Sequence, residues 1–178
     1  MRVAYSGAAP ISPDVLKFFN AIGLPLVEGY GQTEGTGVTS VSRKGRLKIG
    51  KVGQPLSGVE VKIAEDGEIL VKGPGIFKGY FKNPEATAET LKDGWLHSGD
   101  VGELDADGFL KITDRKKDLI ITAGGKNIAP QNIENQLKFS SYINDAVVIG
   151  DLKKFLVALI AIDEENVLKY AQNHKIQF

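Results

Sequence analysis

Apolar and polar positions in the first part of the chain alternate between a short extended run and a helical stripe. Residues 2–6 predict a strand, and the small residues at 7–10 predict a turn. Ser12 and Pro13 have the residue types of a helix N-cap and first helical position, and Gly23 marks the expected end of the helix. The apolar stripe of this helix is expected to lie in the core, and it consists of Val15, Leu16, Phe18, Phe19 and Ile22.

The middle of the chain predicts two β-hairpins. Residues 60–64 alternate between polar and apolar, and residues 68–72 return after an Asp-Gly turn signal. Residues 101–104 and 109–113 form the second pair, and a short helix at 84–91 is expected between the two hairpins.

An acidic turn, Asp105 to Gly108, joins the strands of the second hairpin. Its two aspartates resemble part of a calcium loop. It is too short for an EF-hand loop, however, and it lacks the glutamate at the twelfth position. We therefore interpret it as turn chemistry, in which aspartate side chains bond to nearby backbone N–H groups.

The last third of the chain predicts a small mixed unit. After a first strand and loop, a helix is expected at about 130–139, strands at 146–150 and 155–163, and a closing helix. The predicted fold class is α+β, with a strand-helix edge and hairpins before the charged junction at 114–118 and the small unit after it.

Composition excludes several classes of function. Lys plus Arg equal Asp plus Glu at 22 each, so no basic surface suggests a nucleic-acid partner. The absence of cysteine excludes disulfides and thiolate chemistry. No apolar run approaches the length of a membrane span, so a cytoplasmic location is expected, and peripheral contact is the one kind of membrane contact left open.

Three polar segments set a carboxylate, a guanidinium and an ammonium among glycines. They are Gly94 to Asp100, Asp114 to Asp118 and Ala123 to Asn127, and the predicted strand at 26–28 runs into a further segment, Tyr30 to Glu34. Asp can accept bonds from two ribose hydroxyls, Arg offers a fixed fork of donors, and Lys offers a point charge for phosphate. The combination is suited to binding a nucleotide.

Taken in chain order, the four segments resemble those of the adenylate-forming superfamily. This superfamily contains acyl-CoA synthetases, peptide-synthetase adenylation domains and beetle luciferases. The sequence GKNIAPQNIEN, residues 125–135, is most similar to that of the long-chain fatty acyl-CoA synthetases. The resemblance implies that a carboxylate attacks the α-phosphorus of ATP to give acyl-AMP and pyrophosphate. Coenzyme A then displaces AMP, so ATP or AMP, Mg²⁺ and coenzyme A are the implied cofactors and substrates.

The resemblance implies roles for the segment Tyr30 to Glu34. Thr33 would contact the α-phosphate and Glu34 would hold Mg²⁺, while Tyr30 would lie against the adenine. Further nucleotide-binding positions, offering backbone or close approach, would be Gly7, Ala8, Ala9 and Gly31.

The resemblance also assigns roles around the junction. Asp100 follows Gly99, where a tight turn is expected, and it would bind both ribose hydroxyls, while Arg115 would reach the same sugar. Lys117 would be the hinge on which the small domain turns between the two half-reactions. Along the route of the pantetheine arm, Gly124 and Gly125 would leave space and Lys126 would contact phosphate. His97 and Trp95 are expected to be structural.

Two parts of a complete family member do not occur in the sequence. These are a Ser/Thr/Gly-rich phosphate loop ending in Pro-Lys-Gly and a catalytic lysine near the C-terminus. We therefore expect a fragment that cannot form acyl-AMP alone. Residues 1–115 would be the C-terminal portion of the large AMP-binding domain, and residues 116–178 part of the small C-terminal (lid) domain.

The full-length parent, the longer protein expected to carry this chain, would activate a long-chain fatty acid, and its partners would be small-molecule substrates. Two alternatives stay open at this point. One is another adenylating ligase that acts on an amino or aryl acid. The other is a non-catalytic nucleotide-binding module that stands alone.

Overall fold

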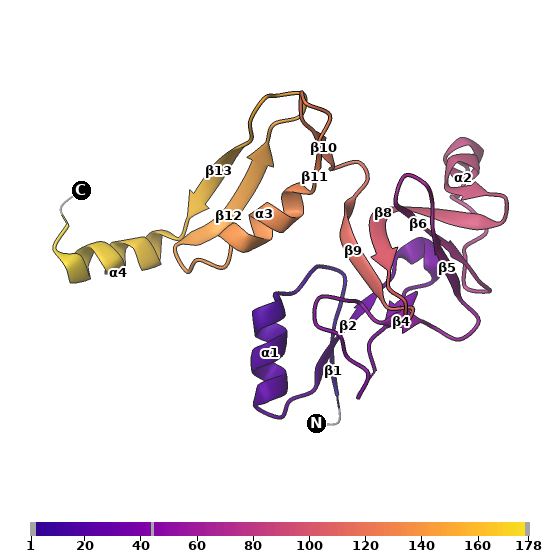
Figure 1. Ribbon diagram of the computed structural model, residues 1–178, viewed down its shortest axis with the longest axis horizontal. Helices are drawn as coiled ribbons and strands as arrows, with labels where there is room; N and C mark the ends of the chain where they lie inside the picture. Colours follow the sequence, from indigo (N-terminus) through magenta and orange to yellow (C-terminus); the bar gives the residue numbers. More distant parts are fainter. Residues whose placement is uncertain (1–2, 44, 177–178) are drawn as a thin grey trace. The chain divides into compact units, whose positions relative to one another are not determined.

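The computed structural model describes residues 3–43 and 45–176, and it has the predicted α+β class (Figure 1). The chain divides into two compact units, which we call unit 1, Met1–Lys116, and unit 2, Lys117–Phe178. Among the described residues, no helix is long and apolar enough to cross a membrane.

The first sheet of unit 1 begins with a parallel pair of strands joined by a helix. The predicted first strand included Arg2, which lies outside the described residues, and the second strand continues two residues beyond its predicted end. The order in the sheet is β1-β2-β3-β4. The elements are β1 (Ala4–Ser6), α1 (Pro13–Ala21), β2 (Leu26–Tyr30), β3 (Ser40–Val41) and β4 (Gln54–Pro55).

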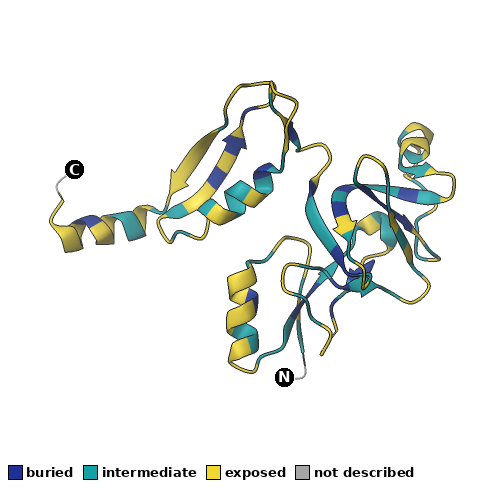
Figure 2. Cartoon of the chain, viewed as in Figure 1, coloured by how far each residue is buried: buried dark blue, intermediate teal, exposed yellow. Residues whose placement is uncertain are grey.

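Helix α1 begins as predicted, because the Ser12 side chain accepts hydrogen bonds from backbone N–H groups of the first turn. The prediction that its whole apolar stripe is core is wrong. Only Leu16 is buried, whereas Val15, Phe18 and Ile22 are exposed. Most of the ribbon of this helix is accordingly drawn in the colour of exposed residues in Figure 2. The cause is geometric, since the main packing partner of α1 among the described elements is the short strand β2, which is too narrow to cover the whole apolar stripe.

The second sheet of unit 1 contains both predicted hairpins. Its order is β5-β6-β8-β7, and β9 pairs with β8. A buried apolar cluster of Ile69, Val71, Leu96 and Leu110 is its core. The predicted short helix is also present, with Asn83 as its N-cap. The elements are β5 (Glu60–Ile63), β6 (Glu68–Lys72), α2 (Pro84–Thr90), β7 (Leu91–Lys92), β8 (Trp95–Leu104) and β9 (Leu110–Arg115).

Strand β8 is longer than predicted. The sequence suggested a turn at Gly99 and a strand from Val101, but the strand begins at Trp95 and Gly99 lies within it at a φ of 72°. The pairing register of β8 shifts near this point, against both β6 and β9. A glycine with positive φ thus accommodates an irregularity in a continuous strand here, rather than ending it.

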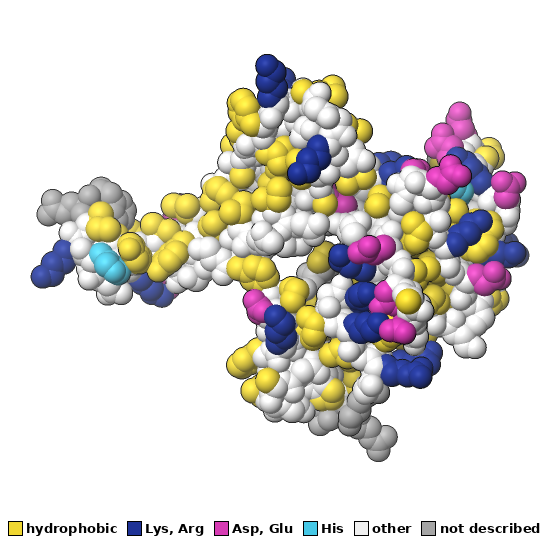
Figure 3. All heavy atoms as spheres, in the orientation of Figure 1, with side chains coloured by type: hydrophobic (Ala, Val, Ile, Leu, Met, Phe, Trp, Pro, Cys, Tyr) yellow, Lys and Arg dark blue, Asp and Glu magenta, His cyan; other side chains and the backbone are white. Residues whose placement is uncertain are grey.

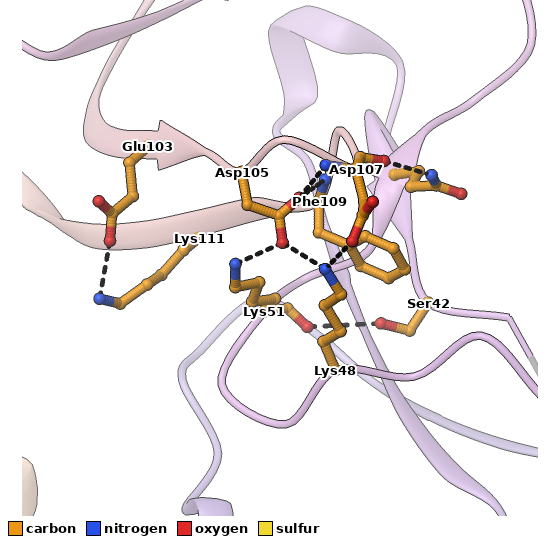
Figure 4. A network of polar contacts seen from close by, with 9 residues as sticks. Ser42, Lys48, Lys51, Glu103, Asp105, Asp107, Phe109 and Lys111 are labelled. Atoms are coloured by element: carbon orange, nitrogen blue, oxygen red, sulfur yellow. Dashed lines mark hydrogen bonds and ion pairs between the residues drawn. The ribbon is translucent and has the colours of Figure 1, made fainter.

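The turn between β8 and β9 is confirmed as a hairpin turn. One carboxylate oxygen of Asp105 accepts hydrogen bonds from the backbone N–H groups of Asp107 and Phe109. The other lies 2.6 Å from the Nζ atoms of both Lys48 and Lys51 (Figure 4). These lysines hold the pKa of Asp105 well below its usual value and fasten the turn to the segment that precedes β4.

Unit 2 is a small α+β unit, as predicted, with element ends that differ from the predicted ones by up to three residues. Helix α3 packs on β12, where Val148 donates a backbone hydrogen bond to Glu134. Every residue of β13 is exposed, and apolar side chains lie on the surface of this unit (Figure 3). The elements are β10 (Ile120–Ile121), β11 (Asn127–Ile128), α3 (Pro130–Leu137), β12 (Ile143–Ile149), β13 (Val157–Ile162) and α4 (Glu164–His174).

Glu28, on β2, is a buried carboxylate whose charge is expected to lower stability at neutral pH. Its Oε2 atom has no hydrogen-bond partner among the described residues. Burial raises the pKa of Glu28, and a hydrogen bond from the Ile11 backbone offsets only part of this rise. Because protonation favours the folded state, the contribution of this group to stability is lost as pH rises through its folded pKa.

We therefore expect Glu28→Gln to raise the free energy of unfolding at pH 7 by about 1 kcal/mol, because the amide has no charge to desolvate and can still accept from Ile11. Urea unfolding at pH 7 and at about pH 5 measures this, and the gain should shrink at the lower pH. The exposed Glu60 provides the control substitution to Gln. A destabilised Glu28→Gln variant at pH 7 would contradict the account.

Candidate functional site

The structure brings three of the predicted nucleotide-binding residues of unit 1 together. Asp100 on β8 lies opposite Arg115 on β9. The Tyr30 hydroxyl, at the end of β2, donates a hydrogen bond of 2.6 Å to Oδ2 of Asp100. Arg115 Nε lies 3.3 Å from Oδ1 of the same carboxylate. We call these three residues the Asp100 cluster.

The electrostatics of the Asp100 cluster follow from its burial. Asp100 is buried, whereas the Arg115 side chain is 66% exposed. Burial, and then the hydrogen bond to Asp100, raise the pKa of Tyr30 well above its ordinary value, so its hydroxyl remains a donor. A carboxylate has about four acceptor positions, so Asp100 can accept further bonds beside these two partners. A ligand with two adjacent hydroxyl groups would match these remaining acceptor positions.

The loops after β1 and β2 lie at one edge of the first sheet. These two strands are parallel, so the segment 7–9 and the segment 31–34 both leave from their carboxyl ends. Ligands of open α/β sheets bind outside such ends. Gly7 packs closely there, since a Cβ on it would lie 3.1 Å from the Gly29 carbonyl oxygen. Ala8 adopts a positive φ of 68°, and Gly7, Ala8 and Ala9 are exposed.

Thr33 and Glu34 belong to a single 3₁₀ turn, Thr33–Gly35. Thr33 is exposed, and the Glu34 carboxylate accepts a hydrogen bond of 2.7 Å from the Tyr80 hydroxyl. The backbone carbonyl of Glu34 also accepts from the Phe77 N–H at 2.8 Å. Sequence reasoning missed Tyr80, because no local pattern relates it to a residue that is 46 positions away.

Gly31 makes the tightest backbone approach in this loop. A Cβ at this position would lie 1.6 Å from the Gly37 carbonyl oxygen. We expect Gly31→Ala to lower the free energy of unfolding by about 1–3 kcal/mol, because the loop must shift to admit the methyl group. Thermal unfolding measures the change. Gly35→Ala is the matched control, since its Cβ would find its nearest neighbour at 3.4 Å. Equal melting temperatures for the two variants would refute the close approach.

The remaining predicted site residues lie in unit 2. Lys117 is its first residue and is exposed. Gly124, Gly125 and Lys126 form an exposed turn between β10 and β11, in which Gly125 has a φ of 76°. Hydrogen bonds to Thr122 close the turn. Their roles stay predictions, because these residues and the Asp100 cluster belong to different units.

Two family models match most of the chain. The model described as AMP-binding enzyme matches residues 1–81, and the model described as AMP-binding enzyme C-terminal domain matches residues 117–177. The chain is 49% identical over 164 residues to a long-chain-fatty-acid–CoA ligase of Mycobacterium bovis, covering 92% of this chain and 27% of that protein. It is 41% identical over 191 residues to long-chain-fatty-acid–CoA ligase 6 of Homo sapiens, covering 99% and 27%. The chain thus spans about a quarter of the length of these relatives.

Solved structures agree with these matches. The o-succinylbenzoate CoA synthetase of Bacillus subtilis, in complex with its acyl-adenylate intermediate, superposes with a TM-score of 0.85 at 32% identity. The match covers 97% of this chain and 40% of that one. The same enzyme in complex with AMP gives a TM-score of 0.82 at 33% identity, with 97% and 39% covered. The chain therefore belongs to the AMP-binding enzyme family.

Proposed function

We propose that this chain is part of an ATP-dependent acyl-CoA synthetase that activates a long-chain fatty acid as acyl-AMP and transfers the acyl group to coenzyme A. The observation that carries the proposal is the Asp100 cluster, which offers a buried carboxylate and an exposed guanidinium beside a tyrosine ring. The names of the relatives support the fatty acid as substrate. The domain boundary predicted after residue 115 lies one residue before the boundary of the two compact units, so the residues up to Lys116 would be the C-terminal portion of the large AMP-binding domain and unit 2 part of the lid.

In this proposal Asp100 accepts from both ribose hydroxyls and Arg115 donates to the same sugar, while the Tyr30 ring lies against the adenine. The backbone of Gly7, Ala8 and Ala9 borders the base, at the strand edge where the Gly31 loop also begins. The hydrogen bond from Tyr30 to Asp100 links the groups that hold the base and the sugar.

The reaction would proceed by attack of the fatty-acid carboxylate on the α-phosphorus of ATP, which forms a P–O bond and releases pyrophosphate. The Thr33 hydroxyl would donate to an α-phosphate oxygen and steady the developing charge. A thiolate of coenzyme A would then attack the acyl carbon, and the C–O bond to AMP would break.

The residues present fit a magnesium ion that arrives with the nucleotide. Mg²⁺ usually takes one or two carboxylates together with substrate phosphates, and it neutralises charge on the phosphates. Glu34 offers one such carboxylate, fixed through one oxygen by Tyr80. No group of three or more His, Cys, Asp or Glu suitable for a metal occurs in the described part of the chain, so a cage made by the protein alone is not what these residues offer.

The second half-reaction would involve unit 2. Lys117 would be the hinge on which the lid turns, since an exposed residue can change φ and ψ without leaving water. Gly124 and Gly125 would leave space for the pantetheine arm, and Lys126 would contact phosphate. The partners expected for the parent are therefore small molecules, namely the fatty acid, ATP and coenzyme A.

The test is fatty-acid-dependent exchange of pyrophosphate into ATP by the purified full-length parent. We expect exchange with long-chain fatty acids that requires both ATP and Mg²⁺. Exchange driven only by aryl or amino acids would support the other adenylating ligases. No exchange with any carboxylic acid, from a folded protein, would support a non-catalytic nucleotide-binding module.

A further inference from the structure

A closed ring of polar contacts joins Lys116, the last residue of unit 1, to Gly99 and Glu68. The Lys116 backbone N–H donates to the Gly99 carbonyl at 2.8 Å. The Gly99 N–H in turn donates to Oε1 of Glu68 at 2.9 Å, and Lys116 Nζ lies 3.0 Å from Oε2 of Glu68. Gly99 therefore holds the backbone of Lys116 and Glu68 holds its side chain, and these two residues are bonded to each other. We call Glu68, Gly99 and Lys116 the Glu68 clamp.

Two further side chains reinforce the Glu68 clamp. Lys116 Nζ also lies 2.6 Å from Oδ2 of Asp66, and His97 Nδ1 lies 3.1 Å from Oε2 of Glu68. Burial raises the pKa of Glu68, but hydrogen bonds from Lys116, His97 and Gly99 outweigh it, so the pKa lies below its ordinary value. The carboxylates of Asp66 and Glu68 raise the pKa of Lys116. The clamp is thus charged at neutral pH.

The Glu68 clamp lies next to both the Asp100 cluster and the start of unit 2. Gly99 directly precedes Asp100, and Lys116 lies between Arg115 and the first residue of unit 2, Lys117. An exposed ion pair contributes little to stability, because water screens it. A nearly buried carboxylate that bonds two chain segments at once fixes their relative position instead, because Glu68 is only 7% exposed.

We propose that Glu68 and Lys116 are positioning residues that hold the strand carrying Asp100 and the residue before the hinge as one rigid piece. This inference rests on the proposed function. With the Glu68 clamp intact, a rotation at Lys117 ends at Lys116 and leaves the Asp100–Arg115 pair in place. Without the clamp, the same rotation also moves Arg115 and Gly99, so the ribose site loosens whenever the lid turns.

The first test uses amide hydrogen exchange on the full-length parent without nucleotide. Lys116→Met removes the ammonium but keeps a side chain of similar length. We expect the Gly99 amide to exchange about tenfold faster in this variant, because Glu68 loses its main partner. Lys111→Met is the matched control, since it breaks an exposed ion pair with Glu103 on the neighbouring strand. Unchanged exchange at Gly99 in Lys116→Met would overturn the clamp, whatever the enzyme's substrate.

The second test measures KM for ATP and kcat for both half-reactions in the same variants. We expect Lys116→Met and Glu68→Gln to raise KM for ATP about fivefold to tenfold while changing kcat for adenylation less, and Lys116→Arg to restore KM. A purely structural role would lower the amount of folded enzyme and leave KM unchanged, which would overturn the positioning role. A wild-type parent that lacks activity would count against the proposed function, while the exchange result would still decide the clamp.

Discussion

Replacing Asp100 with alanine in the full-length parent is expected to weaken AMP binding by about tenfold to a hundredfold. The variant removes the charged acceptor that Asp100 is proposed to offer to the ribose hydroxyls, and such an acceptor is worth roughly 1.5–3 kcal/mol. It also removes the partner of the Tyr30 hydroxyl and of Arg115, so both side chains lose their present positions. Titration calorimetry with AMP measures the change directly.

The control for this prediction lies on the same strand. Glu103→Ala removes another β8 carboxylate, one that is 62% exposed and pairs with Lys111, so it should leave AMP affinity within about twofold. Circular dichroism shows whether each variant is folded. An Asp100→Ala variant that is folded and binds AMP like the wild type would return Asp100 to a purely structural role in the β8–β9 pair.

Replacing Lys117 with proline should separate the two half-reactions of the parent. Proline fixes φ near −65° and so restricts the rotation that thioester formation is proposed to require. We expect acyl-adenylate formation to survive, and thioester formation to fall on the order of a hundredfold, since small displacements of reacting groups have effects of that size. Single-turnover adenylation is compared with thioester formation from preformed acyl-adenylate.

The matched control for the hinge is Lys117→Ala, which removes the ammonium but keeps the freedom of φ. If the backbone rotation matters, alanine should leave both half-reactions much closer to the wild type than proline does. Equal losses in both half-reactions of a folded Lys117→Pro variant would rule out the hinge assignment.

Sequence alone predicted the features that depend on neighbouring residues. The two hairpins follow from period-two alternation and turn residues, and the start of α2 follows from Asn83 and the proline after it. The same local signals misled at Gly99, because a positive φ that favours a turn also occurs at an irregularity within a strand. For α1, the apolar stripe predicted a face of the helix, but a sequence pattern does not say which element covers that face.

The candidate site shows the same division. The residue types of the Asp100 cluster marked it as suited to a nucleotide, but the Tyr30–Asp100 hydrogen bond joins residues 70 positions apart. Tyr80 was not predicted, since its partner Glu34 is 46 positions away. The Glu68 clamp was not predicted either, since its contacts depend on how β6, β8 and β9 register against one another. Register depends on the packing of both strands, which no local pattern contains.

The most direct measurement of the proposed function follows oxygen from substrate to product. The full-length parent is incubated with ATP, coenzyme A and a long-chain fatty acid whose carboxylate carries oxygen-18. If the carboxylate attacks the α-phosphorus, one labelled oxygen remains on AMP when coenzyme A takes the acyl group. We therefore expect labelled AMP and unlabelled pyrophosphate, in equal amounts with acyl-CoA. Labelled inorganic phosphate together with ADP, or AMP without label, would contradict the account.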